Sequence, residues 1–321
     1  MGEFDLIARY FKRPVRRSPL GGGDDCALLA PAPGMQLAVS SDMLVEGRHF
    51  LSTVDPTSLG HKALAVNLSD LAACGAAPLG FTLALALPAV DAAWLEGFSA
   101  GLYALADAHG CELVGGDTTR GPLNICVTVF GEVPAGAALL RSGARPGDEL
   151  WVSGTLGDAR LALEAFSGTV QVPMEVFAAA RARMERPTPR VALGLALRGL
   201  ATSAIDLSDG LAGDLGHVLA ASGVGATVDA DAAAACVAAR ATHPALFDGA
   251  TWRQLALSGG DDYELAFTAP AEAHDAVLAA GRASATPVTR IGRIEAAPGL
   301  RIVDAQGAAV AQRFASFDHF G

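Results

Sequence analysis

Residues 81–122, FTLALALPAVDAAWLEGFSAGLYALADAHGCELVGGDTTRGP, decide the fold class of this protein. The apolar run 81–87 predicts a strand, and the large apolar side chains of 91–109 recur at the spacing of one helix face. A second strand is predicted over 111–114, just before a Gly-Gly-Asp triplet. A strand, a long helix and another strand in this order are typical of an α/β protein.

The same alternation continues on both sides of this segment. Further strands are predicted over 36–41, 124–133, 149–153, 203–205, 226–228, 263–268, 288–294 and 300–303, and further helices over 56–73, 158–166, 174–185, 190–200 and 210–222. The chain of 321 residues exceeds the usual length of one domain, and a polar, turn-rich stretch at 141–148 divides it. We therefore expect two domains, residues 1–145 and 146–321.

The protein is acidic, with 34 Asp and Glu against 23 Lys and Arg and a formal net charge of -11. Nucleic-acid-binding proteins usually have the opposite balance, so we expect no nucleic-acid partner. The five cysteines include no C-x-x-C pair, which favours a reduced, cytoplasmic protein. The first residues lack the pattern of a signal peptide, and Pro and Gly interrupt the uncharged run 71–90, so we expect no membrane span.

Several well-known catalytic motifs are absent or misplaced. The G-x-S-x-G match at 97–101 lies inside a predicted helix, whereas a nucleophile elbow needs a strand-to-helix turn. The sequence has no P-loop, no G-x-G-x-x-G after a strand and no Cys/His spacing of a zinc site. Asp206 and Asp209 have the wrong spacing for the D-x-D motif of phospho-aspartate enzymes. A serine hydrolase, a P-loop kinase and a zinc enzyme are thus disfavoured.

Aspartates recur beside Gly and Ser at the predicted ends of strands. The positions are Asp25, Asp42, Asp70, Asp117, the pair Asp206 and Asp209, and Asp261. A single such residue is more often a turn or helix N-cap, and that interpretation suffices for Asp148 and Asp214. Their recurrence predicts instead that several converge on one crevice, because ligands of α/β folds bind at the carboxyl ends of strands.

Carboxylates gathered in one crevice repel one another unless cations lie between them. Oxygen ligands without Cys or His favour Mg²⁺, Mn²⁺ or Ca²⁺, and Mg²⁺ commonly bridges carboxylates to phosphate. Gly115 and Gly116 allow close backbone approach, and Arg120 or Arg141 can add positive charge. The residues alone therefore predict a Mg²⁺-dependent site for a phosphorylated ligand, in which metal ions overcome the negative charge of the protein.

Seven segments, in order along the chain, resemble the thiamine-monophosphate kinase family. They are 23–29 (GDDCALL), 40–50 (SSDMLVEGRHF), 62–73 (KALAVNLSDLAA), 115–122 (GGDTTRGP), 205–211 (IDLSDGL), 258–265 (SGGDDYEL) and 317–320 (FDHF). The family belongs to the superfamily of aminoimidazole-ribonucleotide synthetase and selenophosphate synthetase. The resemblance implies a two-domain α/β fold with mixed sheets, and a homodimer whose shared sheet is built by the N-terminal domain.

The resemblance also implies the reaction and its residues. ATP and thiamine monophosphate would give ADP and thiamine diphosphate by direct, Mg²⁺-assisted transfer of the γ-phosphoryl group, with several metal ions. The implied metal ligands are Asp25, Ser40, Ser41, Asp42, Asp70, Asp117, Asp206 and Asp209, of which Asp42, Asp117 and Asp209 would be catalytic. The implied ATP contacts are Tyr103, Gly116, Asp117, Arg141 and Ser208, and the implied thiamine monophosphate contacts are His49, Asp261 and Phe317.

The chain departs from the family pattern at three of these positions. Asp261 stands where the family usually has Glu, Phe317 where Tyr or Trp is common, and Ser41 where Thr is frequent. None of these changes removes a metal carboxylate, so activity is expected. Two other functions stay open on the sequence: a non-catalytic Mg²⁺/nucleotide sensor, and another ATP-dependent enzyme of the superfamily. A selenide-activating enzyme would want a reactive Cys near the N-terminus, whereas Cys26 resembles a buried apolar residue.

Overall fold

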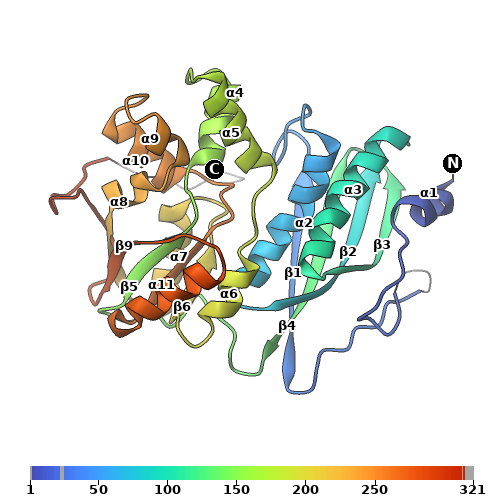
Figure 1. Cartoon of the computed structure of the whole chain (residues 1–321), viewed down its shortest axis with the longest axis horizontal. Coiled ribbons are helices and arrows are strands. Elements are labelled where there is room, and N and C mark those ends of the chain that lie inside the picture. The colour runs from blue at the N-terminus through green and yellow to red at the C-terminus, as the bar shows by residue number, and fades with distance from the viewer. Residues whose placement is uncertain (1, 22–24, 313, 315–321) are drawn as a thin grey trace. The chain divides into compact units, whose positions relative to one another are not determined.

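The computed structural model describes residues 2–21, 25–312 and 314, and the chain forms two compact units (Figure 1). Unit 1 contains the residues up to Leu71 together with Ala76–Gly136. Unit 2 contains Ala72–Gly75 and the residues from Ala137 onward. Each unit combines one sheet with helices, which confirms the mixed α/β class.

Unit 1 is built on a four-stranded sheet with the order β1-β4-β2-β3. Its elements are α1 (Glu3–Tyr10), β1 (Met35–Val45), α2 (Pro56–Ala73), β2 (Ala77–Leu87), α3 (Ala92–His109), β3 (Glu112–Arg120) and β4 (Asn124–Pro134). β4 is antiparallel to both β1 and β2, whereas β2 and β3 are parallel. The edge strands are therefore β1 and β3, two strands that carry predicted site residues.

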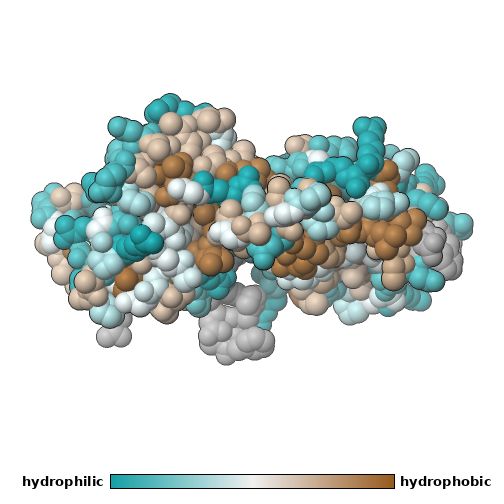
Figure 2. Space-filling view, turned by 90° about the horizontal axis from the view of Figure 1, so that it is seen from below, coloured by the Kyte–Doolittle hydropathy of each residue, from teal (hydrophilic) through white to brown (hydrophobic). Residues whose placement is uncertain are grey.

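The two faces of this sheet differ in what covers them. α2 and α3 lie side by side against one face (Figure 1), where Ile125, Val127 and other alternate residues of β4 are buried. On the opposite face, Leu37, Val39 and Met43 of β1 are 44%, 56% and 54% exposed. Figure 2 shows exposed hydrophobic residues on the surface of unit 1. An antiparallel sheet usually has a polar outer face, so these apolar side chains need a partner.

Glycines bring α2 and α3 into backbone contact. A Cβ on Gly60 would collide with the carbonyl oxygen of Phe98, and one on Gly101 with that of Thr57. The G-x-S-x-G match ends at Gly101 and lies within α3, as predicted, so its glycine serves helix packing. This close contact fixes α2 over the sheet, and α2 carries the polar residues that face β1.

Unit 2 is built on a six-stranded sheet with the order β10-β7-β9-β5-β8-β6. Its strands are β5 (Glu149–Ser153), β6 (Ser203–Asp206), β7 (Gly225–Asp229), β8 (Leu265–Ala269), β9 (Val288–Glu295) and β10 (Gly299–Val303). Its helices are α4 (Asp158–Phe166), α5 (Met174–Glu185), α6 (Val191–Leu197), α7 (Leu211–Ser222), α8 (Ala230–Ala235), α9 (Ala238–Thr242), α10 (Gly249–Ser258), α11 (His274–Ala283) and the short 3-10 helix η1 (Ala271–Ala273). β6 lies at one edge, and its carboxyl end leads into the loop before α7.

The structure corrects the expectation that the aspartates lie at strand ends. β1 continues to Val45 and β3 to Arg120, so Asp42 and Asp117 lie inside strands, and Asp70 lies in the last turn of α2. Of the carboxylates singled out, Asp206 ends a strand as predicted. The expectation for Cys26 was also wrong, because it is exposed in the segment before β1. No helix within the described residues is long and apolar enough to cross a membrane.

Candidate active site

In unit 1, the polar residues of β1 lie against α2. Ser40 and Asp42 are two residues apart and therefore face the same side of the sheet. The hydroxyl of Ser40 donates to Oδ2 of Asp70, with 2.5 Å between the oxygens. The backbone N–H of Asp42 donates to Oδ1 of Asn67, at 3.0 Å. The edge strand and α2 thus bring three predicted metal ligands together, and Asn67 holds the backbone of one of them.

The neighbouring carboxylates of this cluster repel each other. Burial, and in second place the negative charge of Asp70, raise the pKa of Asp42 to about 6. Such a shift is what crowded carboxylates show when no cation separates them. The position is therefore suited to bind a metal ion, which would restore the ionised form.

Ser41 lies on the other side of β1. Its hydroxyl contacts the hydroxyl of Thr128 at 2.9 Å and donates to the carbonyl oxygen of Val127 at 3.2 Å. The structure therefore does not bring the Ser41 side chain together with those of Ser40 and Asp42. Its proposed metal-binding role remains a prediction.

His49 is held through both its ring and its backbone. Its Nδ1 accepts a hydrogen bond from the backbone N–H of Val45, at 3.0 Å, so the neutral ring carries its proton on Nε2. The ammonium of Lys62, a residue only 2% exposed, donates to the carbonyl oxygen of His49 at 2.9 Å. His49 is thus prepared to donate a hydrogen bond from Nε2. Sequence reasoning had assigned no role to Lys62 or Asn67, because their partners lie 13 and 25 residues away.

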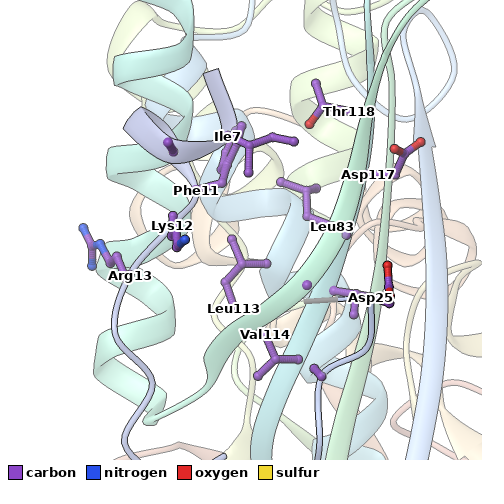
Figure 3. Close-up of a pocket in the computed structure, with 15 residues that line it drawn as sticks. Ile7, Phe11, Lys12, Arg13, Asp25, Leu83, Leu113, Val114, Asp117 and Thr118 are labelled. Atoms are coloured by element: carbon purple, nitrogen blue, oxygen red, sulfur yellow. The ribbon is translucent and has the colours of Figure 1, made fainter. Parts of the chain in front are cut away.

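Unit 1 also contains a cavity of about 770 Å³ beside β3 (Figure 3). Its apolar wall includes Ile7 and Phe11 from the N-terminal segment and Leu113 and Val114 from β3. Its polar lining includes Lys12, Arg13, Asp25, Gly115, Gly116 and Asp117. In Figure 3 the carboxylates of Asp25 and Asp117 lie on one side, and the cations of Lys12 and Arg13 on the other. The volume is that of a typical small-ligand site.

Gly116 is required by the packing of β3 against β2. Its φ is 148°, and a Cβ there would collide with the carbonyl oxygen of Leu83. This glycine leaves its backbone accessible at the cavity, next to Asp117. The Gly-Gly-Asp triplet therefore combines close strand packing with an exposed carboxylate, and its predicted approach to a phosphate remains a prediction.

Tyr103 supports the wall of this cavity and is not among its lining residues. It is 5% exposed, and its hydroxyl donates to the carbonyl oxygen of Phe11 at 2.8 Å. The guanidinium of Arg13 lies 3.5 Å from the centre of its ring. In this structure Tyr103 therefore positions Phe11 and Arg13, and its predicted contact with ATP remains a prediction.

In unit 2, Asp206 ends β6, and the loop between β6 and α7 carries Ser208 and Asp209. This loop pairs with the segment before β8 through backbone hydrogen bonds from Leu207 N–H to Glu264, from Asp261 N–H to Ser208 and from Tyr263 N–H to Leu207, each 2.8 Å long. Asp261 and Tyr263 have φ values of 65° and 50°, a strained region for residues other than glycine. The pairing brings Asp261 beside the Ser208 loop, and the strain is typical of a ligand-binding segment.

Two buried acids hold this arrangement. Asp214, within α7, accepts hydrogen bonds from the backbone N–H groups of Asp209 and Gly210 at 3.0 and 3.1 Å. Burial raises its pKa to about 7, which the bonded N–H groups partly oppose. The N-cap interpretation of Asp214 was wrong, because Gly210 occupies that position. Glu264 is fully buried and pairs with Arg190 and Arg183, at 2.5 and 2.9 Å.

Comparisons with known proteins decide the family. The N-terminal domain model of AIR synthase related proteins matches residues 23–133, and the C-terminal model matches 145–305. Thiamine-monophosphate kinase of Salmonella typhimurium LT2 is 50% identical over 99% of this chain and 98% of its own. The chain belongs to the thiamine-monophosphate kinase family.

Solved structures of this family share the fold. The thiamine-monophosphate kinase of Stenotrophomonas maltophilia K279a superposes with a TM-score of 0.84 at 46% identity, over 96% of each chain. AaThiL, complexed with AMPPCP and TMP, superposes with a TM-score of 0.75 at 28% identity, over 99% of this chain and 96% of its own. The two-domain thiamine-monophosphate kinase fold that the motifs imply is thereby confirmed.

The remaining residues implied by the thiamine-monophosphate kinase motifs are dispersed. Arg141 is exposed, and its carbonyl oxygen accepts a hydrogen bond from the Ser222 hydroxyl at 3.3 Å. Phe317 lies outside the described residues. Among the residues that are described, no three Asp, Glu, His or Cys side chains form a ready metal site. The donors are divided between the two units and between opposite edges of the first sheet.

Proposed function

We propose that this protein phosphorylates thiamine monophosphate with ATP, giving thiamine diphosphate and ADP. The observation that carries the proposal is the 50% identity to a thiamine-monophosphate kinase over almost the whole of both chains. AMPPCP is a non-hydrolysable analogue of ATP, and its presence with TMP in the AaThiL complex supports ATP as the co-substrate.

We further propose Mg²⁺ as the metal. The candidate ligands offer only carboxylate, hydroxyl and backbone oxygens, and this donor set fits Mg²⁺ and excludes a zinc preference. When bound, Mg²⁺ would neutralise the negative charge that builds up between two phosphorylated substrates. Asp42, Asp70 and Ser40 would hold it on β1 and α2, Asp25 and Asp117 at the cavity, and Asp206 and Asp209 in unit 2.

The protein side chains would then mainly position the substrates. The apolar wall of the cavity suits a nucleoside, and the accessible backbone of Gly115 and Gly116 suits its phosphates. The Nε2–H of His49 can donate to the phosphate of thiamine monophosphate, and Asp261 can accept from the aminopyrimidine. That phosphate is already anionic near neutral pH, so in-line transfer needs no strong general base.

We also propose a homodimer whose active sites are shared. Asp42 and Asp117 lie on the two edge strands of a four-stranded sheet, about 14 Å apart at the usual strand spacing. One Mg²⁺ cannot contact two side chains at that separation. A second copy that covers the exposed apolar face of β1 would bring its own Asp117 towards Asp42.

The cytoplasmic location also remains a prediction, supported by the five free cysteines.

The kinase activity is tested by mixing purified protein with ATP, Mg²⁺ and thiamine monophosphate and measuring thiamine diphosphate by chromatography. Product that requires all three additions is expected. A folded protein that binds ATP by calorimetry but forms no product would overturn the proposal and favour the sensor function.

The shared site is tested by complementation. Asp42→Asn and Asp117→Asn each damage every site of their own homodimer, whereas a mixed dimer has one site with both native residues. Mixing the two variants under subunit exchange should restore about a quarter of the wild-type activity. No recovery, with exchange verified by mass spectrometry, would show that the sites are not shared.

A further inference from the structure

The loop that carries Ser208 and Asp209 turns its backbone N–H groups towards a single buried carboxylate. The Oδ2 of Asp214 accepts from the backbone N–H of Asp209 at 3.0 Å and from that of Gly210 at 3.1 Å. A helix residue normally bonds within its own helix, whereas Asp214 reaches back from the fourth position of α7 to residues before it. Two successive N–H groups are therefore oriented by one side chain.

Asp214 is itself in no position to bind a ligand. It is 3% exposed and lies behind the loop, whereas Ser208 and Asp209 are half-buried at its surface. On the other flank, the carbonyl oxygens of Leu207 and Ser208 accept from Tyr263 and Asp261. Hydrogen bonds therefore fix both the N–H groups and the carbonyl groups of the loop. This fixed backbone sets the direction of the Ser208 and Asp209 side chains.

The loop has little room to adopt another shape. Gly210 has a φ of 108°, and a Cβ there would approach the backbone of Ser258 to 3.0 Å. Without an acceptor at position 214, the N–H groups of Asp209 and Gly210 would lose their partner, and unsatisfied N–H groups away from water destabilise the loop. The loop would have to turn these groups towards water or towards the bound phosphate, and so displace Asp209.

We infer that Asp214 is a positioning residue of the phosphoryl-transfer site, which acts by fixing the Ser208–Asp209 backbone that presents metal and nucleotide ligands. The inference rests on the proposed kinase function, in which Asp209 binds Mg²⁺ and Ser208 binds ATP. It assigns a role to a residue that touches neither substrate.

A matched control exists in the same unit. Asp229 accepts from the backbone N–H groups of Asp231 and Ala232, at 2.9 and 3.0 Å, and caps α8. It is half-buried and contacts no predicted site residue. Asp229→Ala therefore removes a similar set of hydrogen bonds. It shows how much activity changes when such bonds are lost away from the proposed site.

The experiment compares Asp214→Ala, Asp214→Asn and Asp229→Ala by the Mg²⁺ concentration that gives half-maximal kinase activity. Removal of a partner behind a metal ligand typically weakens metal affinity 10–100-fold. Asp214→Ala should therefore raise this concentration about ten-fold or more. Asp214→Asn keeps an acceptor oxygen and should show a smaller rise, whereas Asp229→Ala should stay within about two-fold of wild type. An unchanged Mg²⁺ dependence in a folded Asp214→Ala protein would overturn the inference, and so would a larger rise in Asp214→Asn than in Asp214→Ala.

A second measurement separates this inference from the proposed function. Hydrogen exchange by NMR reads the amides of Asp209 and Gly210 directly, without any turnover. Loss of their protection in Asp214→Ala, and its retention in Asp229→Ala, is expected. Unchanged protection would overturn the positioning role even if the kinase is active. A wild-type protein that makes no thiamine diphosphate would overturn the kinase proposal alone, because the loop measurement would still stand.

Discussion

The two units present their carboxylates in different ways. In unit 1, Ser40 and Asp42 lie within a strand, and the pleat of β1 decides which side chains face α2. In unit 2, Asp209 lies in a loop whose shape depends on Asp214 and on the segment around Asp261. The register of the sheet thus fixes the ligands of unit 1, whereas buried polar side chains fix the loop ligand of unit 2.

The two regions nevertheless share one kind of hydrogen bond. In each region, the side chain of a residue outside the predicted metal shell accepts a hydrogen bond from the backbone N–H of a predicted metal ligand. Asn67 accepts from Asp42, and Asp214 accepts from Asp209 and from the next residue, Gly210. The strand-borne site should therefore withstand the loss of its acceptor better than the loop-borne site, since the sheet still holds the strand.

The largest effect is expected from Asp42→Asn. It removes a charge from the proposed metal site with little change in volume, and we expect turnover to fall on the order of 100-fold or more. Because burial and Asp70 disfavour the ionised form, the metal-free variant should unfold at the same temperature or higher near pH 8. Ser41→Ala, on the opposite face of β1, removes no charge and should lower turnover much less than Asp42→Asn does. Equal losses in both variants would contradict the division of β1 into two faces.

Glu264→Gln tests the support of the loop in unit 2. It leaves Arg183 and Arg190 beside a neutral side chain in a buried site, and the free energy of unfolding should fall by about 3–5 kcal/mol. Urea denaturation measures this loss. Glu295→Gln, which removes an exposed pair with Arg293, should lower the free energy of unfolding far less, because solvent screens exposed ion pairs. A small loss for Glu264→Gln would show that the buried cluster does not hold the segment.

Asn67→Ala removes the side-chain acceptor of Asp42. Turnover should fall about ten-fold, as is usual for a residue that orients a metal ligand. The fall should be smaller than that of Asp214→Ala at limiting Mg²⁺, because β4 still pairs with β1. Steady-state kinetics with both variants at several Mg²⁺ concentrations decide the order, and the reverse order would contradict the comparison of strand and loop.

The smallest effect is expected from Lys62→Met. The substitution keeps most of the buried volume and removes one hydrogen bond to the carbonyl oxygen of His49. The loss of a single such bond corresponds to about a two- to ten-fold rise in the KM for thiamine monophosphate, with kcat nearly unchanged. A fall in kcat at constant KM would instead place Lys62 in the transfer step.

The sequence predicts what repeats locally and misses what depends on distant partners. The helices at Pro56–Ala73, Asp158–Phe166 and Met174–Glu185 match their predicted bounds, because each has clear limits and a consistent pattern. The helices from α8 to α11 were not predicted, since alanine-rich segments give little contrast between faces. Strand ends were misplaced where polar residues such as Asp42 continue an edge strand.

Within the site, the motifs predict residue types better than residue roles. Acidic residues beside Gly and Ser mark the loop of Asp209 and the cavity beside Gly116. The structure leaves Asp209 half-buried, and Asp25 and Asp117 exposed at the cavity. The parts played by Asn67, Lys62 and Asp214 follow from hydrogen bonds to other segments, or to the residues before a helix. Spacing along the chain carries no signal for such bonds.

The alternation of β1 constrains how this protein can change over evolutionary time. Leu37, Val39 and Met43, at odd positions, form the exposed apolar surface, and Ser40 and Asp42, at even positions, face α2. Deletion of one residue between them would exchange the two surfaces at once and destroy both. Descendants of this chain can therefore exchange amino acids along the strand one at a time, but gain or lose them only in pairs. An alignment of relatives should show this segment free of single-residue gaps.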